Sequence, residues 1–294
     1  MRKPKLSICE FTTPDTTFEE DLDLYRSVGA TGIGISESKL REGEETQQLA
    51  AFELSGLTAT VCLPTNIGIL PVRPALAYPG PEEPQGRITL MCDSIRRLAP
   101  FKPDCLVVIT GSEQGYSRDE ATKIVVEGFR EAAAVAAEHG TRLALEPCRG
   151  DLGFDGSFLR SLQAAAEMVD VIDCPNVGIC YDVYHHWHET EIIQATESLA
   201  NRIFGVQVND WREPPRSEAD RLFPGDGVID IPALIAALKR GGYDGWYDLE
   251  IFSDDGRWGT ELPDSLWKLP APEAARLGMD SMLKVWQAAR EVAA

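Results

Sequence analysis

The sequence predicts an α/β protein of the (β/α)8 type, a TIM barrel, in which eight parallel strands form a ring inside a shell of helices. Short apolar segments alternate with amphipathic helical segments, this unit occurs eight times, and 294 residues is close to the usual size of such a barrel. The alternation requires a parallel sheet, and eight units allow that sheet to close. A doubly wound open sheet is the alternative, but the first strand lacks the GxGxxG turn typical of that fold. We expect a single domain over residues 1–294.

Each predicted strand is an apolar run that is short enough for a strand of a parallel sheet with both faces covered. The eight runs are residues 5–10, 31–38, 58–64, 105–111, 142–147, 177–182, 203–210 and 245–252.

Each predicted helix follows one of these strands and has apolar residues at the three- and four-residue spacing of an amphipathic helix. The eight segments are residues 17–29, 45–56, 87–99, 118–140, 157–172, 189–200, 230–242 and 273–294.

Three connections, residues 65–86, 211–228 and 253–271, are too long to be simple turns. All three follow strands, so in a barrel they lie at the carboxyl-terminal face, where the active sites of such barrels are found. Loops of this length in a compact domain are commonly functional. We therefore expect the three loops to surround the site.

Composition excludes several classes of partner. The formal net charge of −19 repels a phosphate backbone, which argues against nucleic acid. No stretch approaches the roughly 20 apolar residues that span a membrane, and the N-terminal segment lacks the apolar part of a secretory signal. The seven cysteines show no CxxC spacing and lie mostly in apolar runs, which is typical of a reduced, cytoplasmic protein with buried thiols.

Polar side chains lie at or near the ends of four consecutive predicted strands: Glu146, Asp182, Gln207 and Glu250. In a barrel the last inward residues of the strands converge, so these side chains could meet around one centre. Three carboxylates and an amide oxygen suit one divalent ion; Mn2+ is the expected species, with Mg2+, Co2+ and Zn2+ as alternatives. Without a cation the buried carboxylates would repel one another. Each acid taken alone could instead be a helix N-cap or an ion-pair partner.

Three of the four histidines follow Asp182 closely. His185, three residues after Asp182, can lean over the pocket and hydrogen-bond a substrate oxygen. His186 and His188 are expected to face the loop or solvent, and His139 to end a helix. The histidine run is therefore mostly not the expected metal site.

The segments "LALEP", "CYDVYH", "VQVND" and "GYDGWYDLEIF" resemble, in this order, the four ligand-bearing strand ends of the xylose isomerase-like barrels grouped as sugar phosphate isomerases and epimerases. The likeness covers nearly the whole chain. It implies that Glu146, Asp182, Gln207 and Glu250 bind one divalent metal ion. It also implies that His185 and Arg212 contact the substrate.

The chain departs from individual members of that family. Gln207 stands where many epimerases of the tagatose 3-epimerase type carry histidine, and with "DVYH" before it the chain looks more like hydroxypyruvate isomerase. However, "PCRGDLGF" after Glu146 lacks a further acid of the epimerases, and "EIFSDDGRWGTELPDSLW" does not match hydroxypyruvate isomerase. Endonuclease IV shares the fold, but its histidine-rich trinuclear zinc site and cationic DNA surface do not fit four histidines and a charge of −19.

The resemblance implies a metal-dependent sugar isomerase or epimerase of carbohydrate metabolism. Proton transfer next to a carbonyl would pass through a metal-stabilised enediolate, with Glu146 and Glu250 removing and returning the proton. The alternative is a metal-dependent lyase or dehydratase, a relative of inosose dehydratase, that acts on a keto-sugar, an inosose or a 3-keto-glycoside. A non-catalytic sugar-binding barrel is the third reading. The expected partner is a small sugar or keto-sugar without a phosphate group, and family members commonly form homo-oligomers.

Overall fold

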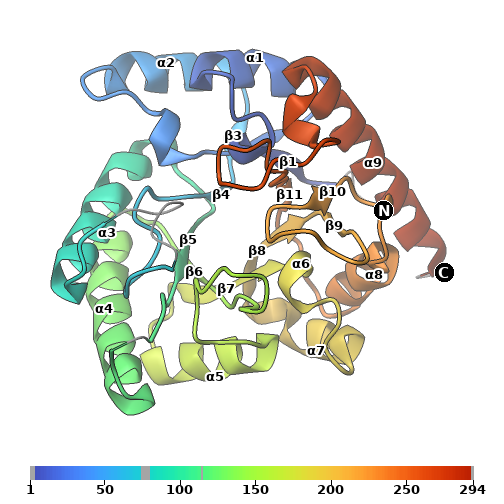
Figure 1. The fold of residues 1–294 in the computed structure, drawn as a ribbon. Helices are drawn as coiled ribbons and strands as arrows, with labels where there is room; N and C mark the ends of the chain where they lie inside the picture. The colour runs from blue at the N-terminus through green and yellow to red at the C-terminus, as the bar shows by residue number, and fades with distance from the viewer. Residues whose placement is uncertain (1–3, 74–79, 114, 293–294) are drawn as a thin grey trace.

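The computed structural model describes residues 4–73, 80–113 and 115–292, and its parallel strands form a ring (Figure 1). The strands are β1 (Leu6–Cys9), β2 (Gly32–Gly34), β3 (Thr58–Ala59), β4 (Val61–Cys62), β5 (Cys105–Ile109), β6 (Leu143–Glu146), β7 (Val177–Asp182), β8 (Ile203–Val208) and β11 (Tyr247–Leu249). Their order in the sheet is β3-β2-β1-β11-β8-β7-β6-β5-β4, and neighbouring strands are parallel.

The two ends of this order belong to one stretch of chain, since β3 and β4 are separated only by Thr60. The Thr60 N–H donates to the Ile33 carbonyl on one side, and the Thr60 carbonyl accepts from the Cys105 N–H on the other. The ring therefore closes through Thr60. The predicted (β/α)8 barrel is confirmed, and the open doubly wound sheet is wrong.

Helices surround the ring, and a long helix follows each of the eight strand positions. They are α1 (Phe18–Ser27), α2 (Glu45–Ser55), α3 (Pro84–Leu98), α4 (Arg118–Glu138), α5 (Leu162–Ile172), α7 (Ile192–Leu199), α8 (Ile231–Arg240) and α9 (Ala271–Val292). Capping boxes define the starts of α1 and α4, where Thr17 and Ser117 exchange hydrogen bonds with Glu20 and Glu120. Across the residues that the structure describes, no helix is both long and apolar enough to cross a membrane.

Helix α5 begins at Leu162, five residues later than the sequence predicts. Residues before it are held in an extended conformation: the Phe158 N–H donates to Thr110 Oγ1, and the Gly111 N–H donates to the Gly156 carbonyl. The Ser161 hydroxyl then accepts from the Ala164 N–H and caps the helix. The longer loop between β6 and α5 contributes to the pocket described below.

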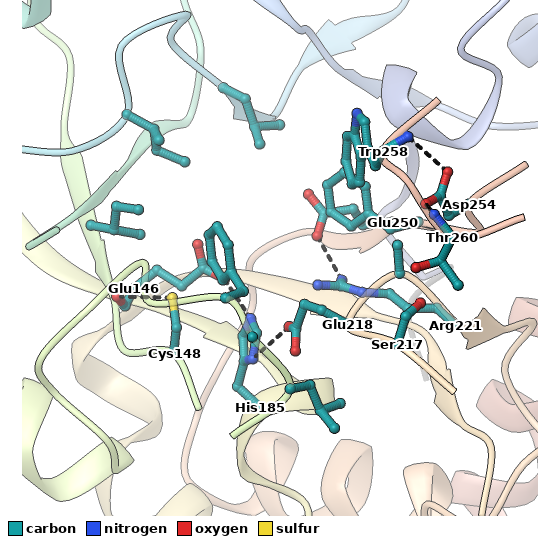
Figure 2. A pocket seen from close by; sticks show the side chains of 18 residues that line it. Glu146, Cys148, His185, Ser217, Glu218, Arg221, Glu250, Asp254, Trp258 and Thr260 are labelled. Atoms are coloured by element: carbon teal, nitrogen blue, oxygen red, sulfur yellow. Dashed lines mark hydrogen bonds and ion pairs between the residues drawn. The ribbon is translucent and has the colours of Figure 1, made fainter. Parts of the chain in front are cut away.

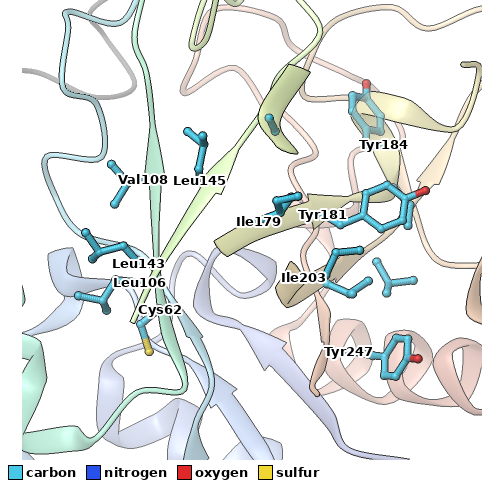
Figure 3. Packing of buried hydrophobic residues seen from close by; sticks show 14 of the residues in the cluster. Cys62, Leu106, Val108, Leu143, Leu145, Ile179, Tyr181, Tyr184, Ile203 and Tyr247 are labelled. Atoms are coloured by element: carbon cyan, nitrogen blue, oxygen red, sulfur yellow. The ribbon is translucent and has the colours of Figure 1, made fainter. Parts of the chain in front are cut away.

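The core has two layers because side chains alternate across the strands. Leu106, Val108, Leu143 and Leu145 belong to the cluster that packs between the barrel and the helices (Figure 3). The alternate residues, including Cys105, Val107 and Ile109, fill the barrel interior with Cys9 and Cys180. All seven cysteines are free and six are buried, and four of these, Cys9, Cys105, Cys148 and Cys180, pack as small apolar side chains in the interior cluster.

Candidate active site

A pocket of about 190 Å3 lies at the carboxyl-terminal end of the barrel (Figure 2). Each of the three long loops expected around the site contributes to its lining, through Ile67, Glu218 and Trp258 among others. The charged and ionisable side chains in the lining are Glu146, His185, Glu218, Arg221, Glu250 and Asp254, and Cys148 adds a thiol.

The four predicted ligands lie on neighbouring strands β6, β7, β8 and β11. Glu146 and Asp182 are the last residues of β6 and β7, and Asp182 is paired in register with Gln207 on β8. Glu250 follows β11, and its Oε1 accepts from Gln207 Nε2 at 2.5 Å. All four side chains are at least nine-tenths buried. The structure therefore brings the four predicted residues to one end of the barrel interior, where Glu146 and Glu250 line the pocket and Asp182 and Gln207 do not.

Arg221 links two of these acids and was missed by the sequence reasoning. Its Nη1 donates to Asp182 Oδ2 at 2.7 Å and to Glu250 Oε2 at 2.9 Å. The guanidinium lies 4.5 Å from the ring centre of Tyr184 and 4.6 Å from that of Phe252. Arg221 begins β10 (Arg221–Leu222), which pairs antiparallel with β9 (Asp210–Trp211) in a hairpin that the strand pattern did not predict. No periodicity marks two-residue strands, so the sequence held no local signal for Arg221.

Arg212, the predicted substrate contact, does not line the pocket. Its Nε donates to Asp220 Oδ1 at 3.1 Å and its Nη2 to Asp264 Oδ2 at 3.0 Å. Arg216 bonds the same two acids, so the four side chains tie the loop before β10 to the loop before α9. A direct contact between Arg212 and a substrate remains a prediction.

His185 is 2 % exposed and lies among the acids. Its Nε2 is 3.6 Å from Glu146 Oε1 and 3.8 Å from Asp182 Oδ2, while its Nδ1 is 3.7 Å from Glu218 Oε1. Burial, followed by the Arg221 charge, lowers the pKa of His185 well below its usual value, which keeps the ring neutral. His185 lines the pocket, which agrees with its predicted position over it.

His186 differs from expectation, because it is fully buried rather than facing the loop or solvent. Its Nδ1 lies 2.5 Å from Glu189 Oε1 and its Nε2 lies 2.9 Å from the Pro147 carbonyl. His186 therefore joins the short helix α6 (Val183–His186) to the loop after β6. His188 is exposed, as expected, and His139 is the C-cap residue of α4, which agrees with its expected place at the end of a helix.

Glu218 is a second residue that the sequence reasoning missed. Its side chain is 19 % exposed, and among the described residues neither of its carboxylate oxygens has a hydrogen-bond partner. Burial raises the pKa of Glu218 to about 8, against the opposing charges of Arg221 and Arg149. Glu218 is therefore mainly protonated at pH 7.

Burial also raises the pKa values of the two proposed acid–base residues. For Glu146 the largest cause is burial, and the charges of Asp182 and Glu250 add to it, so its pKa lies well above the usual range. Burial raises the pKa of Glu250 to about 7, although Arg221 opposes the shift. Among the described lining residues Arg221 is the one arginine or lysine, and it faces several acids. Ionisation of Glu146, Glu218 and Glu250 together would give the site an excess of negative charge, which a divalent cation would balance.

The donor atoms also fit a metal ion. Carboxylate oxygens such as those of Glu146, Asp182 and Glu250 are the ligand type of a hard divalent ion. The Gln207 amide turns its Nε2 toward Glu250, and its Oε1 accepts from Cys180 Sγ. Glu146, Cys148 and His185 form a second, overlapping set, with donor atoms that all lie within 4.8 Å of one another. A carboxylate, a thiol and an imidazole together are typical zinc ligands.

Comparison with known proteins places these observations in a family. The chain matches the family model for xylose isomerase-like TIM barrels over residues 22–285. It is 26 % identical over 178 residues to the inosose isomerase of Bacillus subtilis (strain 168), covering 59 % of each protein. It is 30 % identical over 156 residues to the hydroxypyruvate isomerase of Escherichia coli (strain K12), covering 53 % of this chain and 57 % of the relative. The inosose dehydratase of Erwinia tasmaniensis is 28 % identical over 167 residues, which cover 49 % of this chain and 52 % of the relative.

The match therefore spans about half to three fifths of the length of these curated relatives. Among solved structures, protein SMc04130 from Sinorhizobium meliloti 1021 has a TM-score of 0.81 at 25 % identity, covering 96 % of this chain and 98 % of that protein. The structure of the IolI protein with a zinc atom has a TM-score of 0.77 at 21 % identity, and the match covers 96 % of this chain and 97 % of that protein. The family model covers most of the barrel, so the chain belongs to the family of xylose isomerase-like TIM barrels.

Proposed function

We propose that this protein is a divalent-metal-dependent sugar isomerase or epimerase, which moves a proton next to the carbonyl of a sugar or keto-sugar. The observation that carries the proposal is the geometry of two acids, Glu146 and Glu250, which are both buried and both line one pocket. A carboxyl whose pKa lies near the working pH can take up and return a proton. Similarity to an inosose isomerase and a hydroxypyruvate isomerase supports the same class of reaction.

In this proposal Glu146, Asp182, Gln207 and Glu250 hold the ion, and Mn2+ is the expected species. When bound, the ion would supply Lewis-acid polarisation of the substrate carbonyl. The zinc atom of the IolI structure supports a divalent ion in this family. Each carboxylate has two oxygens, so a ligand oxygen does not prevent the other oxygen from exchanging a proton.

Glu146 and Glu250 lie on different sides of the pocket (Figure 2). Glu146 would remove the proton from the carbon next to the carbonyl, and Glu250 would return one. Return to the opposite face of the same carbon gives an epimer, whereas return to the neighbouring carbon gives an isomer. In this proposal Arg221, which lines the pocket while Arg212 does not, binds a substrate oxygen on which negative charge develops, and neutral His185 hydrogen-bonds a hydroxyl.

A second candidate, a lyase or dehydratase, is favoured by Glu218. A buried carboxyl with a pKa of about 8 is an acid at pH 7, and it could protonate an oxygen that leaves the substrate. Similarity to an inosose dehydratase supports this alternative. Release of water or of an aglycone, in place of an isomeric sugar, would select it.

The test is deuterium exchange into a panel of ketoses and 3-keto-glycosides, followed by NMR in heavy water with Mn2+ and with chelator. The wild-type protein should catalyse exchange with Mn2+. Glu146→Gln should reduce the rate at least about 100-fold, because a general base is lost. Glu138→Gln, at the exposed end of α4, is the matched control and should leave the rate unchanged. Unchanged exchange in Glu146→Gln would refute the assigned base, and absence of exchange with every compound would favour a binding protein.

A further inference from the structure

One side of the pocket is apolar in a way that the proposed proton chemistry does not require. Leu63 follows β4, Ile67 lies in the next loop and Ile109 ends β5; each is at most 3 % exposed. The loop after β6 adds Leu152 and Phe154 to this wall. Within the described parts of the chain, these segments bring no charged side chain and no hydroxyl or amide side chain to this wall, apart from Glu146 itself.

A second apolar surface follows β11. The rings of Phe252 and Trp258 lie 5.1 Å apart at 35°, and Trp258 meets Trp267 edge-on at 5.1 Å. Asp254 fixes this surface, because its carboxylate accepts from the backbone N–H groups of Gly256, Trp258 and Thr260. The Asp254 oxygens are thereby occupied, although the residue lines the pocket (Figure 2).

The pocket is therefore divided by polarity. Its polar part, with Glu146, Arg221 and Glu250, can pair with hydroxyl and carbonyl oxygens. Hydroxyls placed against Leu63 or Ile109 would lose water without gaining a partner, and each such loss costs roughly tenfold or more in affinity. An apolar group in the same place would gain affinity by leaving water. A sugar with a hydroxyl on every carbon is thus poorly matched to the whole pocket.

We propose that the natural substrate is a keto-sugar that carries an apolar substituent of about the size of an aryl ring. The sugar part binds at Glu146, Arg221 and Glu250, as the proposed function requires. The substituent lies between the wall formed by Ile109 and Phe154 and the surface formed by Phe252 and Trp258. The sugar part of this inference rests on the proposed function, whereas the apolar part rests on the pocket lining alone.

The test compares the affinities of methyl and phenyl 3-keto-β-D-glucopyranoside by isothermal titration calorimetry, with the Mn2+-loaded protein. The phenyl compound should bind at least about tenfold more tightly. Phe154→Ala removes one side of this wall and should lower the ratio of the phenyl affinity to the methyl affinity towards one. Tyr116→Ala is the control: Tyr116 is a partly buried aromatic residue of the loop after β5 that does not line the pocket.

Equal affinities, tighter binding of the methyl compound, or no binding of the phenyl compound would overturn the inference. Glu146→Gln separates it from the proposed function, because this variant should keep the preference for phenyl while it loses deuterium exchange. If the wild-type protein prefers the phenyl compound but catalyses no deuterium exchange, the inferred substrate class is supported and the proposed proton transfer is refuted. If it catalyses exchange but shows no preference for the phenyl compound, the proton transfer is supported and the substrate class is refuted.

Discussion

Glu218 lines the pocket, whereas Asp182 is buried against Arg221 outside its lining, and the two acids differ in their hydrogen bonds. Asp182 accepts from the Tyr184 N–H, from Asn209 Nδ2 and from Arg221 Nη1. Glu218 has no such donor among the described residues, and burial raises its pKa to about 8. A residue without partners is costly when ionised, so Glu218 resists ionisation until the pH exceeds neutrality.

This difference predicts how stability depends on pH. An unfolded glutamate ionises near pH 4.3, whereas folded Glu218 keeps its proton up to about pH 8. Between these values the folded state binds more protons, so the free energy of unfolding falls as the pH rises, by at most about 1.4 kcal/mol per pH unit for one group. Glu218→Gln removes this contribution and should flatten the decline between pH 5 and pH 8.

Urea denaturation of chelator-treated protein at several pH values measures the slope. Glu213→Gln, an exposed acid of the same loop, is the control and should keep the wild-type slope. If the free energy of unfolding of Glu218→Gln falls as steeply with rising pH as that of the wild type, Glu218 is not the group that stays protonated in the folded state.

At the scale of elements, the hairpin of β9 and β10 decides which arginine reaches the pocket. The Asp210 carboxylate accepts from the N–H groups of Trp211, Gly225 and Ile229 and thereby joins β9 to the segment that follows β10. The returning strand carries Arg221 over the acids, while Arg212 pairs with Asp220 and Asp264 on the outside. Two residues nine positions apart thus have different roles because the chain reverses between them.

We expect Arg221→Met to reduce kcat/KM for the substrate identified by the exchange assay at least 100-fold. The change removes a charge-assisted contact and leaves Asp182 and Glu250 without their shared cation. Arg212→Met should reduce it less than about tenfold, since part of the network remains through Arg216. Steady-state kinetics measure both effects, and circular dichroism checks that each variant is folded. A larger loss of kcat/KM in Arg212→Met than in Arg221→Met would favour Arg212 as the residue that contacts the substrate.

The elements themselves were largely predictable from the sequence, because each strand and helix carries its own periodicity. All eight strand positions and all eight long helices are present, with changes at their ends. What failed depends on contacts between distant segments: Thr110 and Gly111 delay the start of α5, and Pro147 draws His186 into the interior. Glu146 and Asp182 end β6 and β7 as the strand pattern predicts, whereas Arg221 and Glu218 belong to a segment without regular spacing.

At the scale of the whole molecule, closure of the ring gathers acids that lie more than a hundred residues apart. Glu146 and Glu250 come from β6 and from the end of β11, yet both line one pocket. The chain as a whole carries a formal charge of −19, so cations also accumulate at its surface. Any measurement of metal binding must therefore distinguish binding in the pocket from non-specific accumulation of cations at the surface.

We expect Mn2+ to raise the melting temperature of chelator-treated protein by about 5 °C at a hundredfold excess over its dissociation constant. This estimate follows because a ligand that binds only the folded state adds about 2.7 kcal/mol under these conditions. Asp182→Asn should abolish the shift, whereas Glu138→Gln, an exposed acid on α4, should retain it. About 0.3 M NaCl in all samples screens the surface attraction but not a buried site.

The same experiment with Zn2+ separates the two overlapping donor sets of the pocket. Cys148→Ser should reduce the Zn2+ shift and leave the Mn2+ shift unchanged if Zn2+ uses the thiol beside Glu146 and His185. Loss of both shifts in Cys148→Ser would place the thiol in a single common site. An equal Mn2+-induced rise in melting temperature in the wild type and in Asp182→Asn would contradict the proposed ligand set. It would show that Asp182 is not a ligand and that the ion binds away from the four strand ends.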